Sequence, residues 1–173
     1  NVLDAYLPEC TYVDSDAFAY CFLGYNTVLD LPKCEYVGNS AFYSCGFSQL
    51  NLPECTYIDS NAFGNCQHLY LRSIYLPKCE YIGRGAFGHN GYLLSVNLPE
   101  CKYLTDQAFE YCSNFSVIYL GSTSVCSLSV RLSSIDAFYE TGITSSTGSI
   151  FVPASLVSAY KSAERWSYYS DRI

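Results

Sequence analysis

Short runs in which apolar and polar residues alternate recur along the chain. In Leu29-Asp30-Leu31 and Ile74-Tyr75-Leu76, an apolar residue lies on each side of one variable residue. Alternation with a period of two is typical of a β-strand whose outer residues face a core and whose middle residue faces solvent. The other runs of this kind are Leu50-Asn51-Leu52, Val96-Asn97-Leu98, Ile118-Tyr119-Leu120 and Ile150-Phe151-Val152. We therefore expect short strands that lie side by side in a parallel sheet.

A longer sequence repeat surrounds these runs. The tetrapeptide Leu-Pro-Glu/Lys-Cys recurs with successive prolines 24, 21, 24 and 22 residues apart. An Ala-Phe pair begins nine residues after each of these prolines, so the length changes all fall between the Phe and the next Pro. Repeats of about 20 to 29 residues with Leu at set positions have the size of leucine-rich repeats, which bury their apolar side only against neighbouring repeats.

The Ala-Phe-x-x-Cys segment of each repeat is too short for a full helix, and we expect one helical or 3₁₀ turn there. The phenylalanines should form a column in the core: Phe18, Phe42, Phe63, Phe87, Phe109 and Phe138. A second aromatic column consists of Tyr12, Tyr36, Tyr57, Tyr81 and Tyr103. It could serve as a carbohydrate platform, but we favour a packing role because each Tyr is fixed beside a core Val, Ile or Leu.

Composition limits the class of protein. Half of the 173 residues are hydrophobic, which is enough for one domain with a continuous core. Nine Lys and Arg against sixteen Asp and Glu give a net charge of −7, and the cations are scattered singly, so we expect no nucleic-acid partner. No apolar run approaches the ~18 residues needed to span a bilayer. The chain has no Met and opens directly on repeat-like sequence, so we expect it to be part of a longer polypeptide.

Ten cysteines fall into two columns, with Cys126 outside both. The columns are Cys10, Cys34, Cys55, Cys79 and Cys101, and Cys21, Cys45, Cys66 and Cys112. No Cys-x-x-Cys occurs, which argues against a zinc or redox motif. We interpret the columns as ladders of small buried thiols. A spacing of ~4.8 Å between coils would permit disulfides, but parallel Cβ vectors suit their dihedral angle poorly.

The residue after each proline alternates in charge along the series Glu9, Lys33, Glu54, Lys78 and Glu100. Equivalent residues of stacked coils are direct neighbours, so alternating signs would favour one register. Duplication of a two-coil unit of 45 or 46 residues would produce the same pattern. Both interpretations require stacked coils.

The Leu-Pro-x-Cys, Tyr-Ile-Gly and Ala-Phe-x-x-Cys series resembles the BspA-like leucine-rich repeats of bacterial surface proteins, from Leu7 to about Leu120. Residues 132–138, 144–148 and 151–157 resemble the closing coil and C-terminal segment of that family. The chain departs from the pattern at Asn90, which replaces the second Cys of the fourth coil, and at Gly121, which replaces a Pro. The resemblance implies a secreted or cell-wall-associated bacterial protein, a role in adhesion, and a module that occurs beside others.

The predicted fold is a right-handed leucine-rich-repeat solenoid with a parallel β-sheet along one face. Residues 1–153 form the solenoid, with five clear coils, a degenerate sixth and a closing strand, and residues 154–173 form a C-terminal cap. Ser155 is a plausible N-cap of a helix that ends near Glu164. One stripe of this helix is apolar and consists of Leu156, Val157, Tyr160, Ala163 and Trp166. No equivalent cap precedes Val2, so we expect an exposed strand edge there.

No catalytic motif is present in the sequence. His68 and His89 are the conventional candidate bases, and both lie in the variable half of their coils without a recognisable partner. The Ser-rich stretch 122–134 lacks a Gly-x-Ser-x-Gly elbow and is interpreted as the degenerate sixth coil. A cation column of Asp14, Asp16 and Asp59 is interrupted by Gly38, Gly83 and Thr105, which favours plain surface carboxylates. We expect no enzymatic activity, cofactor or metal.

The middle residues of the predicted strands are the candidate ligand-binding column. Packing constrains the flanking Leu and Ile but leaves these positions free, and they combine aromatic with short polar side chains. Their members are Tyr6, Asp30, Asn51, Tyr75, Asn97, Tyr119 and Phe151. The β-propensity of Tyr and Phe could account for the aromatic members, but Asp and Asn are poor strand formers. The sequence therefore predicts a surface module that binds a host protein or a glycan, with a passive spacer or assembly module of a larger bacterial surface protein as the alternative.

Overall fold

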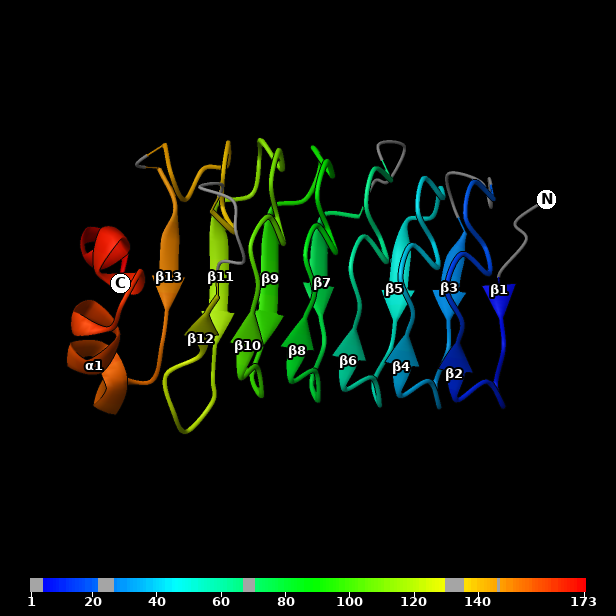
Figure 1. Ribbon diagram of the computed structural model, residues 1–173, viewed down its shortest axis with the longest axis horizontal. Helices are drawn as coiled ribbons and strands as arrows, with labels where there is room; N and C mark the ends of the chain where they lie inside the picture. The colour runs from blue at the N-terminus through cyan, green and yellow to red at the C-terminus, as the bar shows by residue number, and fades with distance from the viewer. Residues whose placement is uncertain (1–4, 22–26, 67–70, 130–135, 146) are drawn as a thin grey trace.

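The chain forms a solenoid of stacked coils, with residues 5–6 and the C-terminal residues at opposite tips of the long axis (Figure 1). The structure, a computed structural model, describes residues 5–21, 27–66, 71–129, 136–145 and 147–173. Each coil contributes strands to two rows, whose arrows point in opposite directions in Figure 1. The predicted solenoid with a parallel sheet is confirmed.

The first row contains the strands that the alternating runs predicted. They are β1 (Ala5–Tyr6), β3 (Val28–Asp30), β5 (Gln49–Asn51), β7 (Ser73–Tyr75), β9 (Ser95–Leu98), β11 (Val117–Leu120) and β13 (Ser149–Phe151). All pairs are parallel, and the row consists of two sheets, β1-β3-β5 and β7-β9-β11-β13. The row is therefore interrupted between β5 and β7.

The second row is a sheet that the sequence did not predict. It runs without interruption through β2 (Tyr12–Val13), β4 (Tyr36–Val37), β6 (Tyr57–Ile58), β8 (Tyr81–Ile82), β10 (Tyr103–Leu104) and β12 (Ser127–Leu128). In each of these two-residue strands the second residue is buried. The buried Val, Ile or Leu of this row faces the core from the side opposite the first row.

The core between the two rows contains the predicted phenylalanine column. Rings of adjacent coils stack nearly parallel, with centroids 5.1 Å apart for Phe18 and Phe42 and 5.6 Å apart for Phe87 and Phe109. Phe42 through Phe138 are fully buried, whereas Phe18 in the first coil is only half-buried. The phenylalanine column is therefore partly exposed to solvent at the first described coil.

The Ala-Phe segments form turns closed by hydrogen bonds between residues three apart, as in one 3₁₀ turn, but no helical segment follows. Cys45 N–H donates to the carbonyl of Phe42 within the coil, while Phe42 N–H donates to Ala62 in the next coil. Bonds to the neighbouring coil use the N–H groups that a helix would bond internally. The turns have two positions with a left-handed backbone, with φ between 54° and 61°. The first position is occupied by Asp16, Ser40, Asn61, Gly85 and Gln107. The second is occupied by Tyr20, Ser44, Asn65, His89, Tyr111 and Glu140.

The C-terminal residues cover the last coil, but not with the single helix that was predicted. A 3₁₀ turn η1 (Ala154–Leu156) leads into the helix α1 (Val157–Ser162), and a second 3₁₀ segment η2 (Trp166–Arg172) follows. Ser155 lies inside η1 and is not an N-cap; the cap position of α1 is Leu156. The helix ends early because Ala163 is extended, with ψ 146°. Among the described residues, no helix is long and apolar enough to cross a membrane.

Candidate functional site

The predicted ligand-binding column lies along the surface of the first row of strands. The backbone register pairs Tyr75, Asn97, Tyr119 and Phe151 across adjacent strands, and it pairs Tyr6, Asp30 and Asn51 in the same way. The four aromatic members are exposed, Tyr75 by 59% and Tyr119 by 42%. Asp30 and Asn97 are half-buried, and Asn51 is exposed. The structure thus brings the predicted residues together as two aligned groups.

Contacts within this column differ between its two groups. In the first, the Asn51 amide donates to Asp30 Oδ1 over 2.6 Å, so both polar groups are engaged. In the second, the rings of Tyr119 and Phe151 stack with centroids 4.8 Å apart. Asn97 separates the Tyr75 strand from the Tyr119 strand, which places those strands about 9.6 Å apart. The second group therefore presents an aromatic pair and a separate ring on either side of one amide.

A shallow hollow marks the interruption between β5 and β7. It has a volume of about 430 Å³, and its lining includes Leu50, Arg72, Ser73 and Tyr75. Leu50 is half-buried here, whereas the equivalent Leu29 and Ile74 are buried. The Leu52 N–H has no backbone acceptor among the described residues, although the equivalent Leu31 and Leu76 donate to Asn51 and Asn97. The hollow lies between the two groups of the column.

The tyrosine column lies on the outside of the second row of strands. Tyr36, Tyr57 and Tyr81 are half-buried, and Tyr12 is 54% exposed. The rings stack on each other, with centroids 4.6 Å apart for Tyr12 and Tyr36 and 4.3 Å apart for Tyr57 and Tyr81. Because the ring faces cover one another, the column packs against itself and not into the core. A sugar could reach the ring edges of the inner members but not their faces.

Eight of the ten cysteines are buried, as the ladder prediction expects, and all ten are free thiols. Burial raises the pKa of Cys34 and Cys45 to about 11, and that of Cys55, Cys66 and Cys112 to about 12. Such thiols are protonated at neutral pH and are poor nucleophiles. Cys10 is half-buried and Cys21 is exposed, so these two are the accessible thiols.

Cys126 belongs to the first cysteine column, which corrects the prediction that it lies outside both. Its Sγ is 3.6 Å from the Sγ of Cys101, and both residues are fully buried. The corner before β12 is two residues longer than the corner before β10, because Leu120 to Ser127 spans seven residues and Leu98 to Tyr103 spans five. Cys126 lies one residue before Ser127, whereas Cys101 lies two residues before Tyr103, so its thiol reaches the column from the next position along the longer corner.

His89 and Asp59, which were considered for catalysis and for cation binding, are engaged in contacts with neighbouring residues. His89 stacks on Tyr111, with centroids 4.7 Å apart, and its Nε2 is 3.8 Å from Glu110 Oε1. Asp59 accepts bonds from Ser60 N–H and from Tyr36 O–H. His68 lies outside the described residues. Within the described ranges, no three His, Cys, Asp or Glu side chains are grouped to hold a metal ion.

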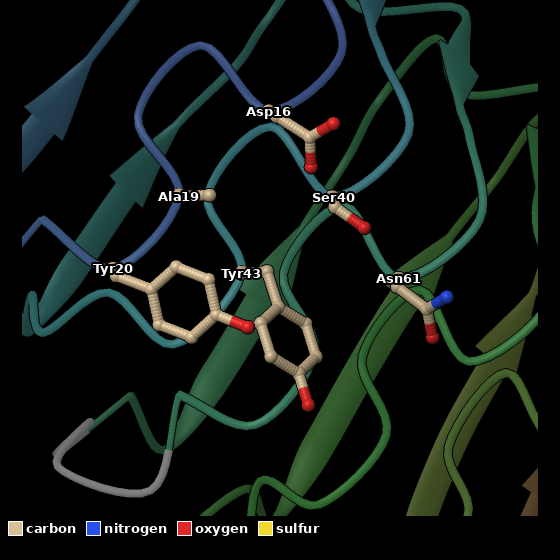
Figure 2. A pocket seen from close by; sticks show the side chains of 6 residues that line it. All are labelled: Asp16, Ala19, Tyr20, Ser40, Tyr43 and Asn61. Atoms are coloured by element: carbon tan, nitrogen blue, oxygen red, sulfur yellow. The ribbon is translucent and has the colours of Figure 1, made fainter.

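A second candidate surface, which the sequence did not indicate, lies along the Ala-Phe turns. A hollow of about 280 Å³ lies there, and Figure 2 shows the side chains that line it: Asp16, Ala19, Tyr20, Ser40, Tyr43 and Asn61. These residues come from three successive coils at positions that the repeat leaves variable. A sequence signal existed in the equal spacing of Asp16, Ser40 and Asn61 after their prolines, but the turn geometry that aligns them was not anticipated.

Comparisons with known proteins agree with this architecture. No curated protein matches the chain. A crystal structure of a leucine-rich repeat protein from T. pallidum matches with a TM-score of 0.50 and 25% identity, over 75% of this chain and 71% of that one. The family model of the BspA type leucine-rich repeat region, in six copies, matches residues 4–116 and 35–162. Stacked coils, the paired parallel rows and these matches together show that the chain belongs to the BspA type leucine-rich repeat family.

Proposed function

We propose that this chain is a non-enzymatic recognition module of a bacterial surface protein, which binds a host protein or a glycan through the first row of strands. The observation that carries the proposal is the pair of aligned groups, Tyr6 to Asn51 and Tyr75 to Phe151, along the first row of strands. Its four exposed aromatic rings interleave with Asp30, Asn51 and Asn97 at positions that the core does not constrain. Aromatic and amide side chains in one patch suit stacking combined with hydrogen bonding.

The family supports the proposed location and role. BspA type repeats are typically found in proteins associated with the bacterial surface, and a solenoid of this kind offers an extended regular face. Among the described candidates, the buried thiols are protonated and His89 is engaged with Tyr111 and Glu110, which supports a non-enzymatic role. An adhesin-like role is therefore the function that we favour.

The strand-face hypothesis is tested with the double variant Tyr75→Ala, Tyr119→Ala. Both rings are exposed, so the variant should keep the circular dichroism spectrum and melting temperature of the parent chain. Binding to immobilised collagen, laminin or mucin, whichever the parent chain binds, should fall at least tenfold, since exposed aromatic anchors at an interface contribute roughly 1.4 kcal/mol or more.

The matched control is Tyr12→Ala, Tyr103→Ala, which removes two exposed tyrosines from the second row. This control should retain binding within twofold. Equal losses in both double variants, or undiminished binding by a folded Tyr75→Ala, Tyr119→Ala chain, would place the ligand elsewhere. No binding by the parent chain to any of these proteins or to a glycan array would instead favour the spacer alternative.

A further inference from the structure

The hollow at the Ala-Phe turns of the first three coils has the elements of a small-ligand site. Asp16, Ser40 and Asn61 occupy the same repeat position and lie in a row across adjacent coils, with Tyr20 and Tyr43 beside them (Figure 2). The left-handed backbone at the three polar positions is shared by every coil and does not itself mark a site. What distinguishes this stretch is the set of side chains that it carries.

The polar side chains of this row have hydrogen-bonding capacity to spare. Within the described part of the chain, the Asp16 carboxylate and the Asn61 side-chain amide make no hydrogen bond, and both residues are exposed. Ser40 Oγ donates to Asn39 Oδ1 and keeps its own acceptor capacity. At the equivalent position two coils further on, Gln107 accepts from Arg84 and donates to Glu110. The repeat can therefore use this position internally, but it does not do so at Asp16 or Asn61.

Two tyrosines border the row in these coils, in an edge-to-face arrangement that Tyr111 and Tyr139 repeat near the other end of the described solenoid. Tyr20 is 75% exposed, and its ring meets that of Tyr43 edge to face, with centroids 5.6 Å apart and planes at 73°. The position of Tyr43 is occupied by Ala19 in the coil before and by Gly64 in the coil after. A Cβ at Gly64 would lie 3.3 Å from Tyr43 Cδ2, so the glycine gives the ring its space. Small residues thus flank one ring and leave the hollow open on both sides.

Gly85 defines the far end of the row. Its φ is +61°, and a Cβ built there would lie 2.5 Å from Asn61 Oδ1. The amide of Asn61 therefore occupies the space that a side chain at position 85 would fill. The absence of a side chain at position 85 leaves the amide this space at the coil edge, where its donor and acceptor remain available to a ligand.

The chemistry of the lining selects a class of ligand. The lining has one carboxylate and no Lys or Arg, which disfavours anions, and it combines acceptors, donors and a ring face. A volume of about 280 Å³ lies just below the usual range of ligand pockets, which begins at about 300 Å³, and it suits one ring of a larger molecule. We propose that this hollow binds a neutral hexopyranose unit of a glycan. The Asp16 carboxylate accepts bonds from the sugar hydroxyls, Asn61 donates and accepts, and Tyr20 packs against the C–H face of the sugar.

This site is separate from the strand-face column, and the proposal does not depend on the ligand of that column. It is tested by NMR titration of the whole chain with the methyl glycosides of mannose, glucose, galactose and N-acetylglucosamine. At least one of them should shift the amide resonances of Asp16, Tyr20 and Asn61. Asp16→Asn and Tyr20→Asn should each weaken that sugar about tenfold or more, because a charge-assisted bond or a stacked ring is lost.

Asn is chosen in both variants because it tolerates the left-handed backbone found at both positions. The controls are Asp171→Asn and Tyr168→Asn in the exposed part of the cap, which should leave the affinity within twofold. The proposal is overturned if none of the glycosides shifts these resonances, if folded Asp16→Asn and Tyr20→Asn bind like the parent, or if a sialoside binds more tightly than every neutral sugar. A sugar affinity that is lost instead in Tyr75→Ala, Tyr119→Ala would assign the sugar to the strand face and also overturn the turn-edge site.

Discussion

At the scale of single residues, the second cysteine column supplies buried hydrogen-bond donors. The thiols of Cys45, Cys66 and Cys112 each lie 2.8 to 3.2 Å from the carbonyl of a Phe in the preceding coil. In the fourth coil, the Nδ2 of Asn90 donates to the carbonyls of Phe63 and Phe87, over 2.9 and 2.7 Å. Asn90 therefore takes over the donor role of the thiol that it replaces.

The replacement leaves a buried acceptor without a partner. Asn90 Oδ1 is buried and makes no hydrogen bond, and an unpaired buried polar atom costs roughly 1 to 3 kcal/mol. Asn90→Cys removes this atom and keeps a weaker donor, so we expect it to raise the free energy of unfolding by ~1 kcal/mol. Chemical denaturation measures the change. The reciprocal variant Cys112→Asn should destabilise the chain, and the idea fails if Asn90→Cys is the less stable protein.

The buried thiols also predict an alkaline limit to stability. The pKa values of Cys55, Cys66 and Cys112 are raised by burial from 9.0 to about 12. Below pH 9 both the folded and the unfolded chain keep these protons, so the stabilising contribution is complete there. Between pH 9 and 12 the unfolded chain ionises first, and each thiol can lower the free energy of unfolding by up to ~1.4 kcal/mol per pH unit.

Urea denaturation at pH 8, 9 and 10.5 measures this dependence. Cys66→Ala is the comparison, because it loses one ionisable group and should show a shallower fall above pH 9 even though it is less stable at pH 8. Parallel pH profiles for the two proteins would contradict the assignment of the alkaline slope to the buried thiols.

At the scale of elements, the cap is bonded to the main chain of the last corner. The Trp166 indole N–H donates to the Cys126 carbonyl over 2.7 Å, and Cys126 N–H donates to Tyr160 Oη over 2.9 Å. The Trp166 ring also lies 6.0 Å from that of Phe138, the last member of the core column. The cap thus closes the column and fixes the corner that carries the two-residue insertion.

Trp166→Phe separates these two contributions of the cap. It keeps a ring over Phe138 but leaves the buried Cys126 carbonyl without the indole donor, so we expect a loss of about 1 to 3 kcal/mol in unfolding free energy. Thermal and urea denaturation measure the loss. Tyr168→Phe, on a side chain that is 83% exposed, is the control and should change stability little. A Trp166→Phe chain as stable as the parent would show that the hydrogen bond is dispensable.

The sequence could predict the elements whose apolar residues recur at a regular spacing. The first row of strands, the phenylalanine column and the existence of a cap followed from alternation, fixed spacing and an apolar stripe. The second row escaped because two residues, such as Tyr36-Val37, are too few to show a period. Bonds between the turns escaped as well, because a pair such as Phe42 N–H and the Ala62 carbonyl joins different coils and leaves no local signal.

Of the two candidate sites, the sequence predicted one and missed the other. The strand-face column was predicted because alternation identifies its outward positions, and the register aligns them as expected. The turn-edge hollow was not predicted, because it depends on left-handed residues such as Asp16 and Asn61 that align side chains from separate coils. Such an alignment is a property of stacking and cannot be read from one coil.

At the scale of the whole molecule, the two rows of strands are unequally continuous. The second row pairs all six strands from β2 to β12, whereas the first row is interrupted between β5 and β7. Amide hydrogen exchange should report this difference, because protection follows hydrogen bonding. We expect the Leu52 amide to exchange at least about tenfold faster than those of Leu31 and Leu76. Equal protection of the three amides would show that the first row is closed in solution.

The interruption gives the solenoid a preferred place to bend. In the second row, a force along the axis is shared by every pair of strands. In the first row, no strand pairing joins β5 to β7, so only the core and the second row resist the force there. The molecule should then bend as two stiff segments that the second row of strands connects, with the bending concentrated at the hollow beside Tyr75. A ligand that bridges this interruption would experience tension as a change in the spacing of its contacts, so its lifetime would depend on the direction of pull.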